Sequence, residues 1–212
     1  MSNILSFIFL LPSLLIAITI HEFAHAAMAD RLGDPTPRLM GRLTLNPLAH
    51  LDPIGTLLLF FLILSNSSIV FGWGKPVPID IFNLRNPRRD SALISLAGPA
   101  ANLILAVLLS LFLRLPFIAQ LLNYLITSVV FLNIVLAIFN LLPIHPLDGF
   151  KIVHGFLPQE QADQWEELRS LGPLILFLLI FPLFGQSLIS TILGPVINFF
   201  LQILIPYGYT GV

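Results

Sequence analysis

Two histidines and a glutamate could build a metal site in the first apolar stretch of the chain. His21, Glu22 and His25 follow an almost wholly apolar run from Ile4 to Ile20. On a helix, residues four apart share a face, so His21 and His25 could bind one Zn²⁺ while Glu22 handles a proton beside it. Ionisable side chains are expensive in hydrocarbon and mark functional sites there. The spacing therefore predicts a hydrolytic zinc centre in a membrane helix, with Glu22 as the catalytic base.

A third ligand is offered by Asp148, which follows the end of a later apolar span. Pro143 and Pro146 end that helix, and Gly149 lets the backbone turn sharply beside the carboxylate. Two histidines and one carboxylate leave a fourth position for water, as catalytic zinc sites do. We expect one Zn²⁺ per chain and no other cofactor, and the absence of cysteine limits the ligands to His, Asp or Glu. His145 could be an extra ligand, although we favour a hydrogen-bonded histidine at the membrane interface.

Four further polar or aromatic residues are candidates for handling the substrate. Asn102 and Asn140 stand on otherwise apolar helices and could donate an amide N–H to a developing oxyanion, or could join helices by hydrogen bonds. Trp73 and Lys75 lie in the stretch Gly72–Ile79, which could offer an extended edge to an unwound substrate. The alternative for this pair is an interfacial tryptophan anchor beside a lysine that reaches out of the membrane.

The composition indicates an integral membrane protein. The chain is 57% hydrophobic and 10% charged, whereas soluble domains are about a quarter charged. We expect a single domain over residues 1–212, with a core over about 4–157 and accessory C-terminal helices over about 171–206. The first apolar run lacks a basic flank and carries the His/Glu cluster, so we interpret it as a retained span. The net charge of −1 predicts no binding to nucleic acid.

The apolar segments predict an all-α polytopic fold with the zinc site between helices. About five segments are expected to span the bilayer: Ile4–Ala29, Ser91–Leu113, Ile118–Leu142, Leu171–Phe184 and Leu188–Ile205. A further segment, Leu51–Phe71, is ambiguous, because Ser65–Ser68 interrupts its apolar core. The following Gly72–Pro78 is rich in glycine and proline and is typical of extended, β-like chain with turns.

The positions of the two metal-site fragments along their helices constrain the topology. A helix from Ile4 to His21 rises about 25 Å, so the histidines lie near the far face of the membrane. Asp148 also follows the end of its span, so the two helices must run parallel, with one crossing between them. The Ser91–Leu113 span supplies that crossing. We therefore expect Leu51–Phe71 to be re-entrant and to return to the side on which it starts.

The basic residues agree with this topology. With a re-entrant Leu51–Phe71, all but one of the ten Lys and Arg residues fall on one side of the membrane. The positive-inside rule then places the N-terminus outside the cell membrane and the zinc end near the cytoplasm. Arg114 is the exception, and the others are Arg31, Arg38, Arg42, Lys75, Arg85, Arg88, Arg89, Lys151 and Arg169.

With these motifs in place, the chain resembles the site-2 protease family of intramembrane zinc metalloproteases, peptidase family M50. The matching stretches are His21–His25, Gly98–Asn102 and Asn140–Gly149. Gly41–Pro47 and Gly72–Pro78 are similar to stretches of compact bacterial or archaeal members, which lack PDZ and CBS domains. The resemblance covers about residues 10–155 in the right order.

The resemblance implies hydrolysis of a peptide bond in or near the transmembrane segment of a single-span membrane protein, usually after another protease has trimmed that substrate. The alternative is a non-proteolytic zinc-binding scaffold or a metal transporter in the membrane. A transporter would repeat polar residues through several helices, whereas Leu103–Leu113 and Leu174–Phe181 are nearly free of them. A scaffold has no use for Glu22, a base beside two metal ligands. We therefore expect a multi-pass protease whose partners are the lipid bilayer and its substrate; the oligomeric state is left open.

Overall fold

The structure is a computed structural model that describes residues 3–65, 72–116, 118–181 and 187–206. The helices are α1 (Asn3–Leu32), α2 (Thr36–Leu39), α3 (Pro53–Leu64), α4 (Pro87–Phe112), α5 (Gln120–Asn140), α6 (Asp148–Phe156), α7 (Gln159–Glu167), α8 (Gly172–Ile180) and α9 (Leu188–Leu204). Short 3₁₀ turns lie at Pro47–Ala49, Ile81–Asn83 and Leu168–Leu171. The expected all-helical fold is confirmed for the described residues.

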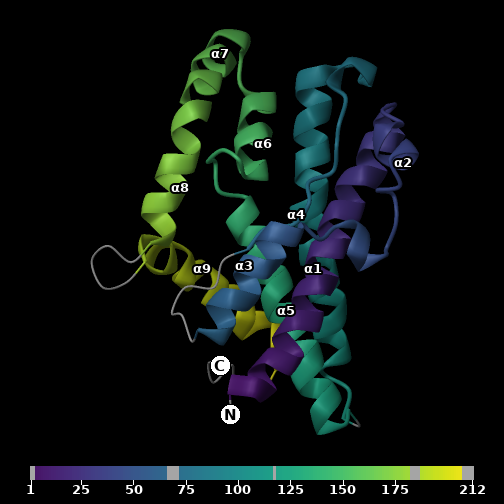
Figure 1. Ribbon diagram of the computed structural model, residues 1–212, viewed down its shortest axis with the longest axis vertical. Coiled ribbons are helices and arrows are strands. Elements are labelled where there is room, and N and C mark those ends of the chain that lie inside the picture. The colour runs from purple at the N-terminus through teal and green to yellow at the C-terminus, as the bar shows by residue number, and fades with distance from the viewer. Residues whose placement is uncertain (1–2, 66–71, 117, 182–186, 207–212) are drawn as a thin grey trace.

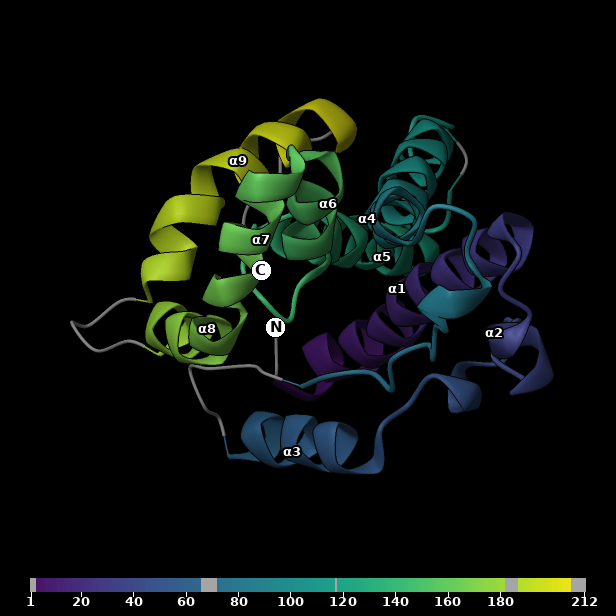
Figure 2. The same cartoon turned by 90° about the horizontal axis from the view of Figure 1, so that it is seen from above.

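Three helices form the centre of the molecule and are long and apolar enough to cross a membrane. They are Ile8–Leu32 within α1, the whole of α4 and the whole of α5. Each packs against the other two, and Figure 1 and Figure 2 show them as one bundle. At about 1.5 Å per residue, the 26 residues of α4 extend for about 39 Å, which exceeds the hydrocarbon thickness of about 30 Å. Pro87 at the start of α4 needs no helical N–H partner, so it marks that boundary.

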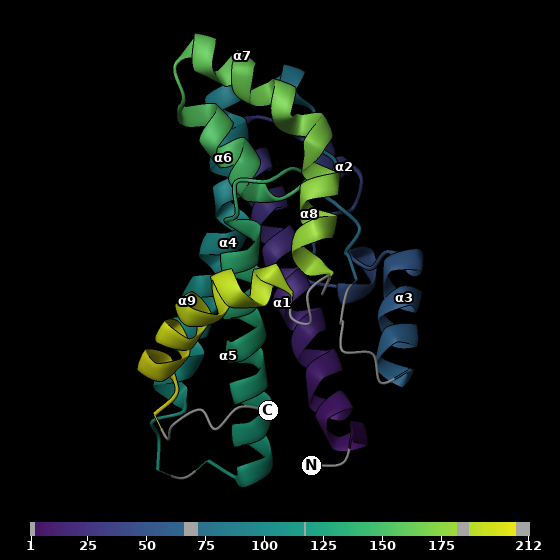
Figure 3. The same cartoon turned by 90° about the vertical axis from the view of Figure 1, so that its left-hand side faces the viewer.

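Of the two C-terminal helices, α9 packs against α4 and α5 of this bundle, and α8 packs against α9. The helix α8 has nine residues and α9 has 17, so both are shorter than the three central helices. Side chains of α9, among them Leu193 and Leu201, share a buried apolar cluster with Val130 and Ile134 of α5. Figure 3 shows α9 running across α5 at a steep angle. Between α6 and α8 the chain forms α7 and the 3₁₀ turn that follows it.

The segment around α3 leaves the bundle and comes back to the same place. Leu51 and Gly74 form an isolated antiparallel bridge, and the Lys75 N–H donates to the His50 carbonyl oxygen at 2.8 Å. Seen from above in Figure 2, α3 lies on the opposite side of α1 from α9. Within the described residues, the expected β-like pairing is limited to this bridge, and residues 66–71 lie outside them.

A buried carboxylate fastens the chain that follows this bridge to the end of α1. Asp34 Oδ1 accepts from the Thr36 N–H and Asn83 Nδ2, each at 3.0 Å, and Oδ2 accepts from the Asp80 N–H at 2.8 Å. Burial alone would raise the pKa of Asp34, but these hydrogen bonds outweigh burial and lower the pKa below its ordinary value. The stretch that passes the histidine face of α1 is therefore held at both ends. Gly74 is held by its bridge to Leu51, and Asp80 is held by its hydrogen bond to Asp34.

Candidate metal centre

Three ligand atoms from distant parts of the chain meet between the central helices. His21 and His25 lie four residues apart on α1, and Asp148 is the first residue of α6. Asp148 Oδ2 is 3.0 Å from His21 Nε2 and 3.2 Å from His25 Nε2. The two histidines are 5% and 7% exposed, so the cluster is closed to bulk solvent on most sides. Within the described part of the chain, this is the group of three or more His, Cys, Asp or Glu side chains that could hold a metal ion.

The other ring nitrogen of each histidine fixes which nitrogen faces the cluster. His25 Nδ1 lies 2.7 Å from the Ile94 carbonyl oxygen, and His21 Nδ1 lies 2.7 Å from Asn102 Oδ1. Both partners are oxygens that only accept, so each Nδ1 carries the proton and donates it. In a neutral imidazole the Nε2 atom is then unprotonated and has a free lone pair. This is the hydrogen-bonding pattern that supports histidine ligands of zinc.

The donor set therefore fits a zinc ion. Two imidazole lone pairs and a carboxylate oxygen point at one another, and such a set repels itself unless a cation lies between its members. Tetrahedral zinc with bonds of about 2.0–2.1 Å holds its ligand atoms about 3.3–3.4 Å apart, close to the separations of Asp148 Oδ2 from the two nitrogens. Three protein ligands leave the fourth position that a catalytic site requires.

The backbone around Asp148 explains how a loop delivers this carboxylate. A Cβ on Gly149 would collide with the carbonyl oxygens of Leu141 and Leu142, so the chain closes here only with glycine. Phe150 is buried and stacks on Trp165, so α7 supports the first turn of α6.

Helix α4 approaches the histidines through a residue with no side chain. A Cβ on Gly98 would lie 2.5 Å from His25 Nε2 and 2.8 Å from His21 Cε1. Pro99 follows inside the helix, where it removes a backbone N–H. Ile94, one turn earlier on α4, presents its carbonyl oxygen to His25. Gly98, Ile94 and Asn102 thus lie at intervals of one turn on the face of α4 that packs against the two rings.

Glu22 lies on α1 between the two histidines and next to the returning chain. Its Oε2 accepts a hydrogen bond from the Val77 N–H at 3.2 Å. The same stretch is fixed upstream, because the Lys75 N–H donates to the carbonyl oxygen of His50. His50 is fully buried, and its Nε2 lies 2.8 Å from the Thr44 carbonyl oxygen. Glu22 is thereby placed against an extended piece of backbone.

The two asparagines predicted for the oxyanion lie in different settings. Asn102 is fully buried, and its Nδ2 donates to the Ala17 carbonyl oxygen at 3.0 Å and to Asn133 Oδ1 at 2.6 Å. Both of its N–H groups are thereby engaged, and its oxygen faces His21, so its position favours holding the histidine over binding an oxyanion. Asn140 is half-buried near the end of α5 and donates to the Leu136 carbonyl oxygen at 2.9 Å. Asn133 was missed from the sequence, although an amide side chain in the apolar middle of α5 was a signal that could have identified it.

The remaining predicted residues lie at the surface of the site. Trp73 is 43% exposed, and a Cβ on Gly55 of α3 would lie 2.5 Å from the Trp73 carbonyl oxygen, so the two segments pack tightly. Lys75 is exposed. Neither side chain belongs to the ligand cluster.

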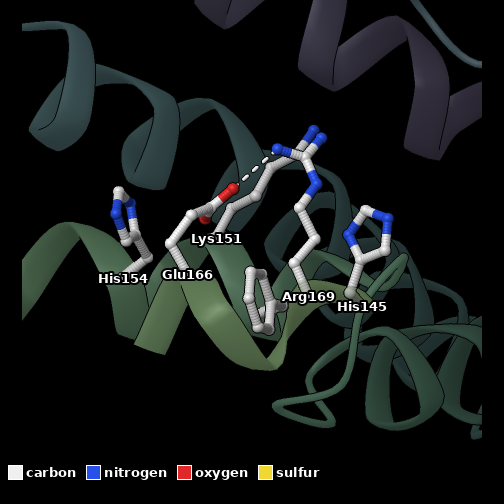
Figure 4. A pocket seen from close by; sticks show the side chains of 6 residues that line it. His145, Lys151, His154, Glu166 and Arg169 are labelled. Carbon is white, nitrogen blue, oxygen red and sulfur yellow. Dashed lines mark hydrogen bonds and ion pairs between the residues drawn. The ribbon is translucent and has the colours of Figure 1, made fainter. Parts of the chain in front are cut away.

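His145 also lies outside the ligand cluster. Its ring packs against Phe150, with ring centroids 5.6 Å apart. Figure 4 shows it at one side of a small surface pocket of about 50 Å³ that Lys151, His154 and the Arg169–Glu166 ion pair also line. Burial, with Arg169 and Lys151 nearby, lowers the pKa of His145 below its ordinary value. The interpretation of His145 as a hydrogen-bonded histidine at the membrane interface stays a prediction.

Comparisons with known proteins point to one family. The model of a family described as Peptidase family M50 matches residues 116–180. The chain is 37% identical over 199 residues to YwhC of Bacillus subtilis, an alignment that covers 90% of this chain and 86% of the relative. It is 35% identical over 177 residues to Rip2 of Mycolicibacterium smegmatis, which covers 82% and 67% of the two chains, and 33% identical over 194 residues to Rip2 of Mycobacterium tuberculosis, which covers 91% and 69%. The printed name of each of these three relatives is "putative zinc metalloprotease". No solved structure matches the chain at a significant level.

Proposed function

Because the chain belongs to peptidase family M50 and is a zinc metalloendopeptidase, we propose that it hydrolyses a peptide bond in or near the transmembrane segment of a membrane-protein substrate. The observation that carries this proposal is the meeting of three lone-pair atoms, from His21, His25 and Asp148, between helices apolar enough to span a membrane. A substrate that reaches this cluster must come through or along the apolar surface of the bundle, which a transmembrane segment does at no cost in desolvation.

In this proposal His21, His25 and Asp148 hold the zinc and Glu22 moves the proton. Zinc bound there would polarise the attacking water and the scissile carbonyl group as a Lewis acid. A carboxylate oxygen of Glu22 takes the proton from the attacking water and then delivers it to the leaving amine nitrogen. The Val77 N–H holds the other side of that carboxylate, so Glu22 stays in place between the two transfers. Asn140 is the proposed donor to the developing oxyanion, because both N–H groups of Asn102 are already engaged.

The proposal assigns substrate contact to the extended chain beside Glu22. Peptide hydrolysis needs an extended backbone, because a helical amide is already hydrogen-bonded and shielded. Residues 74–79 run past Glu22, with the Lys75 and Val77 N–H groups turned toward the protein. Pro76 and Pro78 have no N–H, so the opposite edge of this stretch offers carbonyl oxygens to a partner that donates. Trp73 and Lys75, at the outer end, are the proposed contacts for the flanking part of the substrate.

The proposed topology is multi-pass in the cell membrane, with the metal centre near the cytoplasmic side. The α2 helix, the start of α4 and α7 gather at the end of the molecule away from the N-terminus, and Arg38, Arg88 and Arg89 lie in this end (Figure 1). Arg114 follows α4 at the opposite end. Such a distribution fits the positive-inside rule.

Two finer features of the topology belong to the same proposal. The return of the chain from Leu51 to Gly74 supports a re-entrant segment around α3, since its two ends meet. A total of about five spans, with α8 and α9 added to the three central helices, and a single domain over residues 1–212 stay predictions. Cross-linking or cysteine-accessibility mapping from each side of oriented vesicles would test them, with labelling of α3 from one side only as the expected result.

The experiment that tests the function pairs zinc content with cleavage. Purified protein in liposomes is given a model single-span substrate, and metal is measured by mass spectrometry for the wild type, for Glu22→Gln, and for the matched surface variant Glu160→Gln on α7. We expect zinc in all three proteins and cleavage by all except Glu22→Gln. Cleavage by Glu22→Gln at the wild-type rate would overturn the role of Glu22, and zinc without cleavage of a broad set of single-span substrates would overturn the protease.

A further inference from the structure

A chain of side-chain amides crosses all three central helices and ends at a zinc-ligand candidate. Asn133 of α5 accepts from Asn102 of α4 at 2.6 Å, and Asn102 accepts from His21 of α1 at 2.7 Å. Asn102 and Asn133 are fully buried, and His21 is 5% exposed. In this low-dielectric surrounding an unpaired amide is costly, so each group of the chain is held to its partner.

Two backbone carbonyl groups give this chain its direction. Asn102 Nδ2 also donates to the Ala17 carbonyl oxygen at 3.0 Å, and Asn133 Nδ2 donates to the Val129 carbonyl oxygen at 2.8 Å. A carbonyl oxygen only accepts, so in each amide the nitrogen must face the carbonyl and the oxygen must face the other way. The orientation of both amides therefore follows from the two backbone carbonyl groups.

The direction determines which nitrogen of His21 faces the metal site. Asn133 Oδ1 draws the second N–H of Asn102, so Asn102 turns its oxygen toward His21 Nδ1. That oxygen accepts only, so Nδ1 keeps the proton and Nε2 keeps a lone pair facing Asp148. If Asn102 turned over, its N–H would face Nδ1, the proton would move to Nε2, and His21 could not bind a cation through that atom.

We propose that Asn133 is a positioning residue that sets the tautomer of His21 through Asn102. The proposal rests on the proposed role of His21 as a zinc ligand. It assigns to α5 a function at the metal centre, although α5 carries none of the three ligand atoms. Removal of a residue that hydrogen-bonds a histidine ligand commonly changes metal affinity by about 10–100-fold. Asn102 is such a residue, and Asn133 acts on His21 through Asn102.

The test compares variants that keep or remove the acceptor at position 133. Asn133→Leu is close to asparagine in shape and removes the acceptor. Asn133→Asp, protonated in this apolar setting, still donates to Val129 and accepts from Asn102. Asn123→Leu on the same helix is the matched control, because Asn123 accepts from Thr127 and belongs to no contact of His21. The readouts are the ¹⁵N NMR shifts of the His21 ring, assigned with His21→Gln, and zinc affinity by chelator competition. The NMR samples are zinc-free and also carry Asp148→Ala, because the carboxylate 3.0 Å from Nε2 would otherwise draw a proton to that atom; zinc affinity is measured with Asp148 intact.

We expect Asn133→Leu to populate the Nε2-protonated form of His21 and to bind zinc about 10-fold more weakly or worse, while Asn133→Asp and Asn123→Leu match the wild type. A folded Asn133→Leu with unchanged ring shifts and zinc affinity would overturn the proposal, as would Asn133→Asp behaving like Asn133→Leu. Should Asn133→Leu not fold, Asn133→Thr replaces it, since threonine can return its hydroxyl to Val129 but is too short to reach Asn102. The NMR arm uses no zinc, so it decides the proposal even if the wild type proves not to bind zinc, which would overturn only the proposed function.

Discussion

The Cα of Gly98 faces the ring of His25 so closely that a Cβ built on it would lie 2.5 Å from both Nε2 and Cε1 of that ring. Real side chains do not approach this closely, so the two central helices α1 and α4 meet at the metal centre only because position 98 is glycine. The cost is a glycine inside a membrane helix, about 1 kcal/mol relative to alanine in helix propensity. At this position the close approach outweighs that cost.

Gly98→Ala is therefore expected to weaken zinc binding. The added methyl group displaces the His25 ring from its hydrogen bond with the Ile94 carbonyl oxygen, and zinc affinity should fall by about 10-fold or more. Chelator competition on the purified protein measures this change. Gly194→Ala in α9 is the matched control, because a Cβ there meets nothing within 4 Å. Equal zinc affinity of Gly98→Ala and Gly194→Ala would show that the close packing of α4 on the two histidine rings is not needed for zinc binding.

Asp148→Asn is expected to abolish zinc binding at stoichiometric levels. An amide lacks the charge of the carboxylate that faces both imidazoles, and loss of a ligand should exceed the effect of losing an outer partner, so we expect a fall of more than about 100-fold in affinity. The same substitution at Asp163, an exposed residue of α7, provides the comparison. Retention of one zinc per chain in Asp148→Asn would remove Asp148 from the ligand set.

Val77→Pro is expected to slow cleavage while zinc binding stays unchanged. Proline removes the N–H that Glu22 Oε2 accepts, and a hydrogen bond to a charged group contributes about 1.5–3 kcal/mol. We expect kcat to fall by about 10-fold or more, because the carboxylate is no longer held between its two proton transfers. Val77→Ala keeps the N–H and is the control. Both variants at the wild-type rate would show that the contact does not position Glu22.

Asp34→Asn should destabilise the protein without loss of zinc. An amide has one acceptor oxygen where Asp34 uses two, so the Asp80 N–H loses its partner, at a cost of about 1–3 kcal/mol. The pKa of Asp34 is lowered on folding, so its contribution is present above the ordinary carboxyl pKa of about 4 and is lost as pH falls through the lower folded value.

Thermal unfolding in detergent from neutral to acidic pH would check this prediction. The difference between the wild type and Asp34→Asn should shrink at the acidic end. Asp52→Asn should match the wild type throughout, because Asp52 Oδ1 alone caps α3 and an asparagine oxygen does the same. A difference between wild type and Asp34→Asn that persists unchanged in acid would contradict the role of the charge.

The sequence was sufficient for the features that depend on local spacing. His21 and His25 share a helical face because a helix turns every 3.6 residues, and this holds in any tertiary arrangement. The apolar runs that became α1, α4 and α5 were recognisable because each exceeds the length of a span. The hydrolytic class followed from residue types, since two imidazoles, a neighbouring carboxylate and a later Asp-Gly turn form a zinc donor set with one base.

Only the tertiary structure decided how these pieces meet, because contacts between distant segments leave no periodic trace in the sequence. It joined Asp148 to histidines 127 and 123 positions earlier through a loop that closes on Gly149. It turned the Asn102 oxygen toward His21 and engaged both of its N–H groups, and it brought Asn133 into the same hydrogen-bonded chain. An amide in an apolar helix must find a partner, but its partner depends on which helix packs against it and at what height, and that depends on side chains along the whole interface. The sequence thus determined which atoms could bind zinc, and the packing of three helices determined which of their lone pairs face it.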